Sequence, residues 1–161
     1  MVDKQLIISY KQYDSVTELS AEDRELAAKA LEATDYSYAP YSSFHVGAAA
    51  RLSNGEIVNA GNQENSAFPS GLCAERVTCF YAHSHYPKER IVALAITAVQ
   101  NGVQCELPTY PCGACRQVLN DFEHEKGRIR VILYGSKSTE AFDSVKSLLP
   151  FAFDNWDGIK R

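Results

Sequence analysis

Long apolar runs are missing from this chain of 161 residues. No stretch approaches the ~20 apolar residues that a membrane-spanning helix needs. The first residues also lack the apolar region of a secretory signal, since their longest apolar run covers only residues 6–8. We therefore expect a cytoplasmic protein with no membrane partner.

A basic surface is missing as well. The chain carries 16 Lys and Arg against 20 Asp and Glu, for a net charge of −4, and its basic residues are scattered rather than gathered in a stripe. Proteins that grip a polynucleotide usually show a basic footprint. We therefore expect a small ligand and no polynucleotide partner.

Repeats, linkers and low-complexity segments are absent, so we expect one domain over residues 1–161. Helical spacing predicts helices over residues 21–36, 71–83, 112–124 and, more briefly, 144–149, and strand patterns cover 5–13, 45–52, 56–61, 91–99 and 129–134. Asn54-Gly55 predicts a hairpin between the second and third strands. The strand–helix–strand order over 91–134 predicts a parallel pair. The expected fold is α/β, a three-layer α/β/α sandwich around a mixed sheet of about five strands.

The chain has five cysteines, and three of them, Cys73, Cys112 and Cys115, lie at predicted helix starts. In a reducing compartment, clustered cysteines serve metal binding or catalysis more often than disulfides. The partial positive charge of a helix N-terminus favours thiolate over thiol. Three thiolates from two helix starts can bind one zinc ion, and zinc with three protein ligands keeps a fourth position open for water.

Glu75 lies two residues after Cys73. Residues two apart on a helix do not share a face, so this spacing suits a carboxylate beside the metal site better than a fourth ligand. From there Glu75 could take a proton from water and return it to a substrate. Arg76 could offset the thiolate charge without ligating the metal.

Two other interpretations of the cysteines remain open at this point. The cluster could be a closed structural zinc site with Cys79, Cys105 or a histidine as the fourth ligand. Cys-Gly-Ala-Cys at a helix start is also typical of thioredoxin-like redox sites. The redox interpretation leaves the Cys-Ala-Glu stretch at 73–75 unexplained.

Residues 73–75 (Cys-Ala-Glu) together with 111–115 (Pro-Cys-Gly-Ala-Cys) resemble the zinc-dependent cytidine deaminases, in particular the short-chain, homotetrameric class that uses three cysteines. The resemblance extends to residues 39–49, 62–65, 116–118 and 148–150. Phe68 departs from the family pattern, which commonly has Tyr there, and Gln63 replaces a usual aliphatic residue. Residues 1–19 form an N-terminal extension without a counterpart.

The resemblance implies hydrolytic deamination of free cytidine and 2′-deoxycytidine, a step of pyrimidine salvage. It implies one Zn²⁺ per chain on Cys73, Cys112 and Cys115, with Glu75 as the catalytic proton carrier. It further implies that the nucleoside is contacted by Phe44 on the pyrimidine, Asn62 and Glu64 on the ribose 3′-hydroxyl, the Ala74 backbone, Tyr41 and Phe153.

The aromatic tail from Phe151 to Trp156 is typical of side chains that anchor subunit interfaces. The resemblance adds the expectation of a homotetramer in which Phe153 reaches a neighbouring subunit's site. Two other functions remain open: a deaminase of a related aminopyrimidine, such as a modified nucleoside or a blasticidin-type antibiotic, and an inactive zinc-bound binding module.

Overall fold

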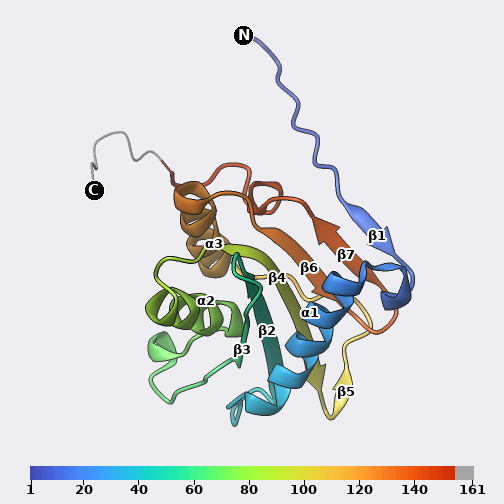
Figure 1. Ribbon diagram of the computed structural model, residues 1–161, viewed down its shortest axis with the longest axis vertical. Helices are drawn as coiled ribbons and strands as arrows, with labels where there is room; N and C mark the ends of the chain where they lie inside the picture. Colours follow the sequence, from blue (N-terminus) through green and yellow to red (C-terminus); the bar gives the residue numbers. More distant parts are fainter. Residues whose placement is uncertain (155–161) are drawn as a thin grey trace.

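The structure is a computed structural model that describes residues 1–154. A seven-stranded sheet forms its centre, with the strands in the order β1-β7-β6-β4-β2-β3 and β5 paired to β4 (Figure 1). The strands are β1 (Lys11–Tyr13), β2 (Phe44–Leu52), β3 (Ile57–Gly61), β4 (Ile91–Gln100), β5 (Val103–Gln104), β6 (Arg130–Tyr134) and β7 (Thr139–Phe142). The β4–β6 pair is parallel, and the other pairs of named strands are antiparallel.

Three α-helices accompany the sheet: α1 (Ala21–Glu32), α2 (Ala74–His85) and α3 (Gly113–Lys126). Four short 3₁₀ turns complete the described chain: η1 (Val16–Glu18), η2 (Ala33–Tyr36), η3 (Phe68–Ser70) and η4 (Val145–Ser147). Within the described residues, no helix has the length and apolar character that crossing a membrane requires.

The two faces of the sheet carry different helices because successive residues of a strand point to opposite sides. Ala48 and Ala50 of β2 belong to one buried cluster, which includes Leu119 of α3 and residues of α2. Ala49, between them, belongs to a second cluster with Leu26 and Ala30 of α1. The sheet therefore separates α1 from α2 and α3, which confirms the predicted three layers.

Gly47 lets α1 and η2 approach β2 closely. A Cβ at this position would overlap the backbone oxygen of Ala30 and lie 2.8 Å from the backbone nitrogen of Thr34. Backbone atoms inside helical turns cannot move aside as a flexible side chain can, so only glycine fits here.

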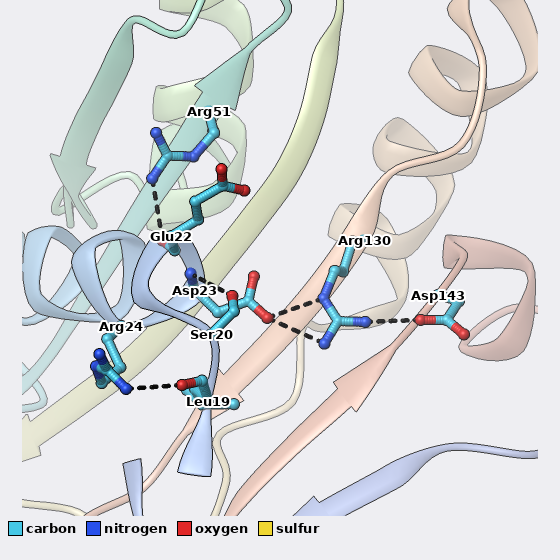
Figure 2. A network of polar contacts seen from close by, with 8 residues as sticks. All are labelled: Leu19, Ser20, Glu22, Asp23, Arg24, Arg51, Arg130 and Asp143. Atoms are coloured by element: carbon cyan, nitrogen blue, oxygen red, sulfur yellow. Dashed lines mark hydrogen bonds and ion pairs between the residues drawn. The ribbon is translucent and has the colours of Figure 1, made fainter. Parts of the chain in front are cut away.

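Arg130 of β6 ties the start of α1 to the chain beyond β7 (Figure 2). Its Nε donates to Asp23 Oδ2 (3.1 Å), and its Nη1 donates to Asp143 Oδ1 (2.6 Å). The backbone N–H of Asp23 in turn donates to Ser20 Oγ (3.1 Å), which caps α1. One arginine thus links the helix layer of α1 to the sheet.

The structure confirms the hairpin at Asn54-Gly55 and the parallel pair, and it extends the predicted pattern elsewhere. The sheet gains β5 and β7, which are two and four residues long. Runs this short hold too few residues to show a period of two. The predicted helix over 21–36 changes to a 3₁₀ turn at Ala33, the one over 144–149 is the 3₁₀ turn η4, and only Lys11–Tyr13 of the strand predicted over 5–13 pairs with the sheet.

Candidate active site

Two helix starts bring the three cysteines together. Cys73 is the N-cap residue of α2, Cys112 is the N-cap residue of α3, and Cys115 lies in the first turn of α3. The Sγ atoms of Cys73 and Cys112 are 3.8 Å apart, and those of Cys112 and Cys115 are 3.5 Å apart. The unpaired N–H groups of both helix starts supply partial positive charge at this point.

The cluster has the dimensions of a zinc site with one open position. Tetrahedral zinc with Zn–S bonds of ~2.3 Å places its sulfurs about 3.8 Å apart, close to the two distances in this cluster. All three ligand atoms lie within 4.8 Å of one another, and among the described residues no fourth His, Cys, Asp or Glu joins the group. The donor set therefore fits zinc bound by three thiolates and does not support the closed four-ligand alternative.

Glu75 places a carboxyl group beside Cys73 and Cys115. It lies in the first turn of α2, its side chain is only 4% exposed, and its Oε2 is buried without a hydrogen-bond partner. Burial, helped by the charge of Cys73, raises the pKa of this carboxyl to about 7. A bound cation would act in the opposite direction. A buried oxygen left unpaired in the fold is available for proton transfer.

Arg76 places positive charge next to the thiols. Hydrogen bonding by Cys115, together with the Arg76 guanidinium, lowers the pKa of the Cys73 thiol to about 5. The Nη2 atom of Arg76 also donates to the backbone oxygen of Gly71 (3.5 Å). Cys73 therefore favours the thiolate, the form that binds metal, while its hydrogen bond with Cys115 raises the pKa of the Cys115 thiol.

A pocket of about 520 Å³ opens beside Cys73. Its lining includes Tyr41, Asn62, Glu64, Phe68, Cys73 and Arg76. The rings of Tyr41 and Phe68 meet edge to face at its rim, with their centroids 5.7 Å apart. The pocket thus joins the cysteine cluster to several side chains that the sequence singled out.

Glu64 is held in place by the segment before β2. Its Oε2 accepts from the backbone N–H groups of Tyr41 (2.9 Å) and Ser42 (3.3 Å), and its Oε1 accepts from Ser42 Oγ (2.5 Å). These bonds lower the pKa of the Glu64 carboxyl, with Ser42 Oγ as the largest cause. Sequence reasoning missed Ser42, and the only signal for it was a hydroxyl residue inside the stretch that resembles the family.

Asn62 uses its amide to join strands. Its Oδ1 accepts from Ser37 Oγ (2.5 Å) and from the backbone N–H of Val46 (2.8 Å), and its Nδ2 donates to the backbone oxygen of Phe44 (3.1 Å). One N–H of the amide remains after these three bonds. Asn62 therefore shapes the pocket wall as well as lining it.

The remaining predicted contact residues, Phe44, Ala74 and Phe153, are not among the residues that line the pocket. Phe44 begins β2 and is half-buried, and Ala74 is the buried first residue of α2. The Phe153 ring is exposed, while its backbone exchanges two hydrogen bonds with the Gln117 amide of α3. Trp156, part of the predicted aromatic tail, lies outside the described residues.

The sequence model of the cytidine and deoxycytidylate deaminase zinc-binding region matches residues 20–130, which include all three clustered cysteines and Glu75. The chain belongs to this family. Among family members, the cytidine deaminase of Sporosarcina psychrophila is 39% identical over 133 residues, which cover 83% of this chain and 92% of the relative. The probable cytidine deaminase of Dictyostelium discoideum is 32% identical over 132 residues, covering 82% of this chain and 84% of the relative.

Solved structures of cytidine deaminases share the fold. The Burkholderia pseudomallei enzyme is 34% identical with a TM-score of 0.67, over 80% of this chain and 97% of that one. The Mycobacterium tuberculosis enzyme is 31% identical with a TM-score of 0.65, over 84% and 99% of the two chains. The match to a zinc-binding region also accounts for Cys112 and Cys115 without a thioredoxin-like redox role.

Proposed function

We propose that this enzyme hydrolyses cytidine and 2′-deoxycytidine to uridine and 2′-deoxyuridine with release of ammonia, a step of pyrimidine salvage. The observation that carries the proposal is the unpaired, buried Oε2 of Glu75 next to three thiols spaced for zinc. A structural metal site has no use for such a carboxyl, whereas hydrolysis of an aminopyrimidine needs a proton carrier beside the water.

One zinc ion per chain would be held by Cys73, Cys112 and Cys115, whose spacing fits it. When bound, zinc would lower the pKa of a coordinated water to roughly 7 and so supply a nucleophile at neutral pH. Arg76 and the two helix starts would compensate the charge of three thiolates.

Glu75 would carry the protons of the reaction. Its Oε2 would take a proton from the attacking water and deliver protons to N3 of the pyrimidine and to the departing amino group. Burial at 4% exposure keeps this carboxyl away from bulk water, so its protons pass to the substrate.

The pocket beside Cys73 would bind the nucleoside. A carboxylate has roughly four acceptor positions, and Glu64 uses three of them within the fold, which leaves one for a sugar hydroxyl. The free N–H of Asn62 can donate to the same hydroxyl. Phe44 and Tyr41 would contact the base and the rim, and the Ala74 backbone would meet the pyrimidine edge.

The active assembly would be a cytoplasmic homotetramer. A site built on free thiols suits a reducing compartment. The exposed rings of Phe151 and Phe153 have the chemistry of interface anchors, and Phe153 would complete the site of a neighbouring subunit.

An absorbance assay over a panel of aminopyrimidines tests the proposal on purified, zinc-loaded protein. Cytidine and 2′-deoxycytidine should be deaminated, and cytosine within single-stranded DNA should not be, because the net charge of −4 offers no basic footprint. If the enzyme deaminated only a modified nucleoside or a blasticidin-type antibiotic, that compound would replace cytidine and 2′-deoxycytidine as the assigned substrate. Tight zinc binding without turnover of any panel member would refute deamination and favour a binding module.

A further inference from the structure

The segment before Cys112 is held by few hydrogen bonds. Among residues 1–154, residues 107–110 make one hydrogen bond to the rest of the fold, from Tyr110 Oη to Glu140 Oε2 (2.6 Å). The next anchors are Glu106, whose backbone oxygen accepts from Lys137 N (3.0 Å), and Pro111, whose backbone oxygen accepts from Arg116 Nε (2.8 Å). Within the described part of the chain, the Tyr110 hydroxyl therefore makes the only hydrogen bond to the fold between Glu106 and Pro111.

Glu140 is a firm acceptor because the sheet fixes it. It lies in β7, is 8% exposed, and sits in register between Leu133 of β6 and Gln12 of β1. Figure 1 shows β7 between these two strands, with β1 at the outer edge of the sheet. A carboxylate acceptor gives a stronger hydrogen bond than a neutral one.

The N-terminal extension builds this edge of the sheet. Residues 1–19 precede the part of the chain that matches the family, residues 20–130, and they supply the whole of β1. Tyr10 stacks on Phe142 of β7 with ring centroids 5.0 Å apart. Without β1, β7 would be the edge strand, and its backbone beside Glu140 would lose its pairing on one side.

We propose that Tyr110 and Glu140 are positioning residues that hold the turn carrying Cys112 and Cys115, with β1 of the N-terminal extension supporting Glu140. This proposal rests on one part of the proposed function, namely that these cysteines ligate zinc. Ligand atoms must stay within about 0.2 Å of their ideal distances, so a loose approach segment weakens metal binding. Tyr110 acts two residues before Cys112, on the side of the segment that precedes the Pro111 and Cys112 carbonyls held by Arg116.

The test compares zinc release to a chromogenic chelator among full-length, zinc-loaded variants. Tyr110→Phe and Glu140→Leu each remove the hydrogen bond and should release zinc about tenfold faster, the lower end of the effect of residues that orient metal ligands. Glu140→Gln keeps an acceptor and should stay within about twofold of the parent protein. The double variant Tyr110→Phe/Glu140→Leu should release zinc no faster than either single variant, because both remove the same contact.

Tyr36→Phe is the matched control. Tyr36 is 53% exposed and donates to Glu32 Oε1 (2.8 Å), much as the 47% exposed Tyr110 donates to Glu140, but it lies in η2. A merely structural role would make Tyr36→Phe and Tyr110→Phe alike in melting temperature and in zinc release. The proposal requires faster release in Tyr110→Phe alone, with a lower kcat and an unchanged KM where a substrate is turned over.

Zinc release of Tyr110→Phe at the parent rate, or equal acceleration in Tyr36→Phe, would overturn the proposal. Failure of the proposed function is a separate result, since zinc release can be followed in a protein that deaminates nothing. Absence of zinc binding in the parent protein would overturn both.

Discussion

Two buried glutamates with opposite environments give the sharpest prediction. Glu75 of α2 and Glu123 of α3 are 4% and 5% exposed. The Oε2 atom of Glu75 has no hydrogen-bond partner. Glu123 accepts from Ile129 N (2.8 Å), Val145 N (3.0 Å), Lys146 N (3.4 Å) and Ser144 Oγ (2.5 Å). The same substitution, glutamate to glutamine, should therefore have different consequences at the two positions.

Glu75→Gln should remove activity and leave the fold almost unchanged. Glutamine has nearly the same size but cannot carry the proton, and general acid–base catalysis contributes ~10²–10⁴ in rate, or about 3–5 kcal/mol in activation free energy. Because Oε2 has no partner to lose, the free energy of unfolding should change by about 1 kcal/mol or less. Zinc content should remain one ion per chain.

Glu123→Gln should destabilise the protein and spare the chemistry. Each oxygen of Glu123 accepts from at least one backbone N–H, so the new NH₂ group would lose at least one bond in either orientation. Loss of the charge also weakens the bonds that remain, since hydrogen bonds to a charged group contribute ~1.5–3 kcal/mol each and neutral ones about 1 kcal/mol, which gives about 3–6 kcal/mol in total. In a chain of this size that is a fall in melting temperature on the order of 10 °C.

Steady-state kinetics on cytidine, calorimetry and metal analysis on both variants measure these effects. The reasoning fails if Glu75→Gln keeps activity within a few-fold of the parent. It also fails if Glu75→Gln lowers the melting temperature as far as Glu123→Gln does, because Glu75 would then have structural partners.

Three further outcomes are expected. Cys112→Ala should lose zinc by metal analysis, and full zinc occupancy in this variant would exclude Cys112 as a ligand. Gly47→Ala should lower the free energy of unfolding by about 1–3 kcal/mol in denaturant titrations, because its Cβ overlaps the Ala30 carbonyl, and a neutral effect would contradict the close approach. Ser42→Ala should raise the pKa of Glu64 measured by NMR, since Ser42 Oγ is the main cause of its low value, so the carboxylate would protonate at higher pH than in the parent; an unchanged pKa would contradict that cause.

Local patterns in the sequence were sufficient for the elements of the core. The run at residues 91–99 is apolar on both faces because β4 lies in the sheet between helix layers, and it corresponds to Ile91–Gln100. The helices that begin near Cys73 and Cys112 followed from the helical spacing of the apolar residues after them. By contrast β7 reads Thr-Glu-Ala-Phe, all four residues of which are buried, and nothing local marks it as a strand. Its hydrogen bonds come from β6, to which residues 135–138 join it, and from β1, which lies near the other end of the chain.

The metal-ligand candidates were predictable because the chemistry restricts the residue types and the helix fixes their spacing. The hydrogen bonds that the Asn62 amide makes within the fold were not predictable from the adjacent residues in the sequence. As part of an extended segment it can point into a pocket, yet its amide also joins Ser37, Phe44 and Val46, which come from other parts of the chain. A polar side chain in a pocket wall can serve both the fold and a ligand, and only the count of its hydrogen bonds separates the two uses.

Hydrogen bonds also distinguish the structural and functional uses of the glutamates in this protein. Glu64, Glu75, Glu123 and Glu140 have the same type of side chain but different roles. Burial does not distinguish the roles of the last three, since all three are buried. Their hydrogen bonds do separate them: both oxygens of Glu123 accept hydrogen bonds and Glu140 Oε2 accepts from Tyr110, whereas Glu75 has one buried oxygen, Oε2, without a partner among the described residues. An oxygen that is already bonded stabilises the fold, while a buried oxygen without a partner costs free energy unless a ligand or a reaction uses it. Burial of Glu75 therefore costs folding free energy that the fold does not recover, and we attribute its presence to the chemistry of the site.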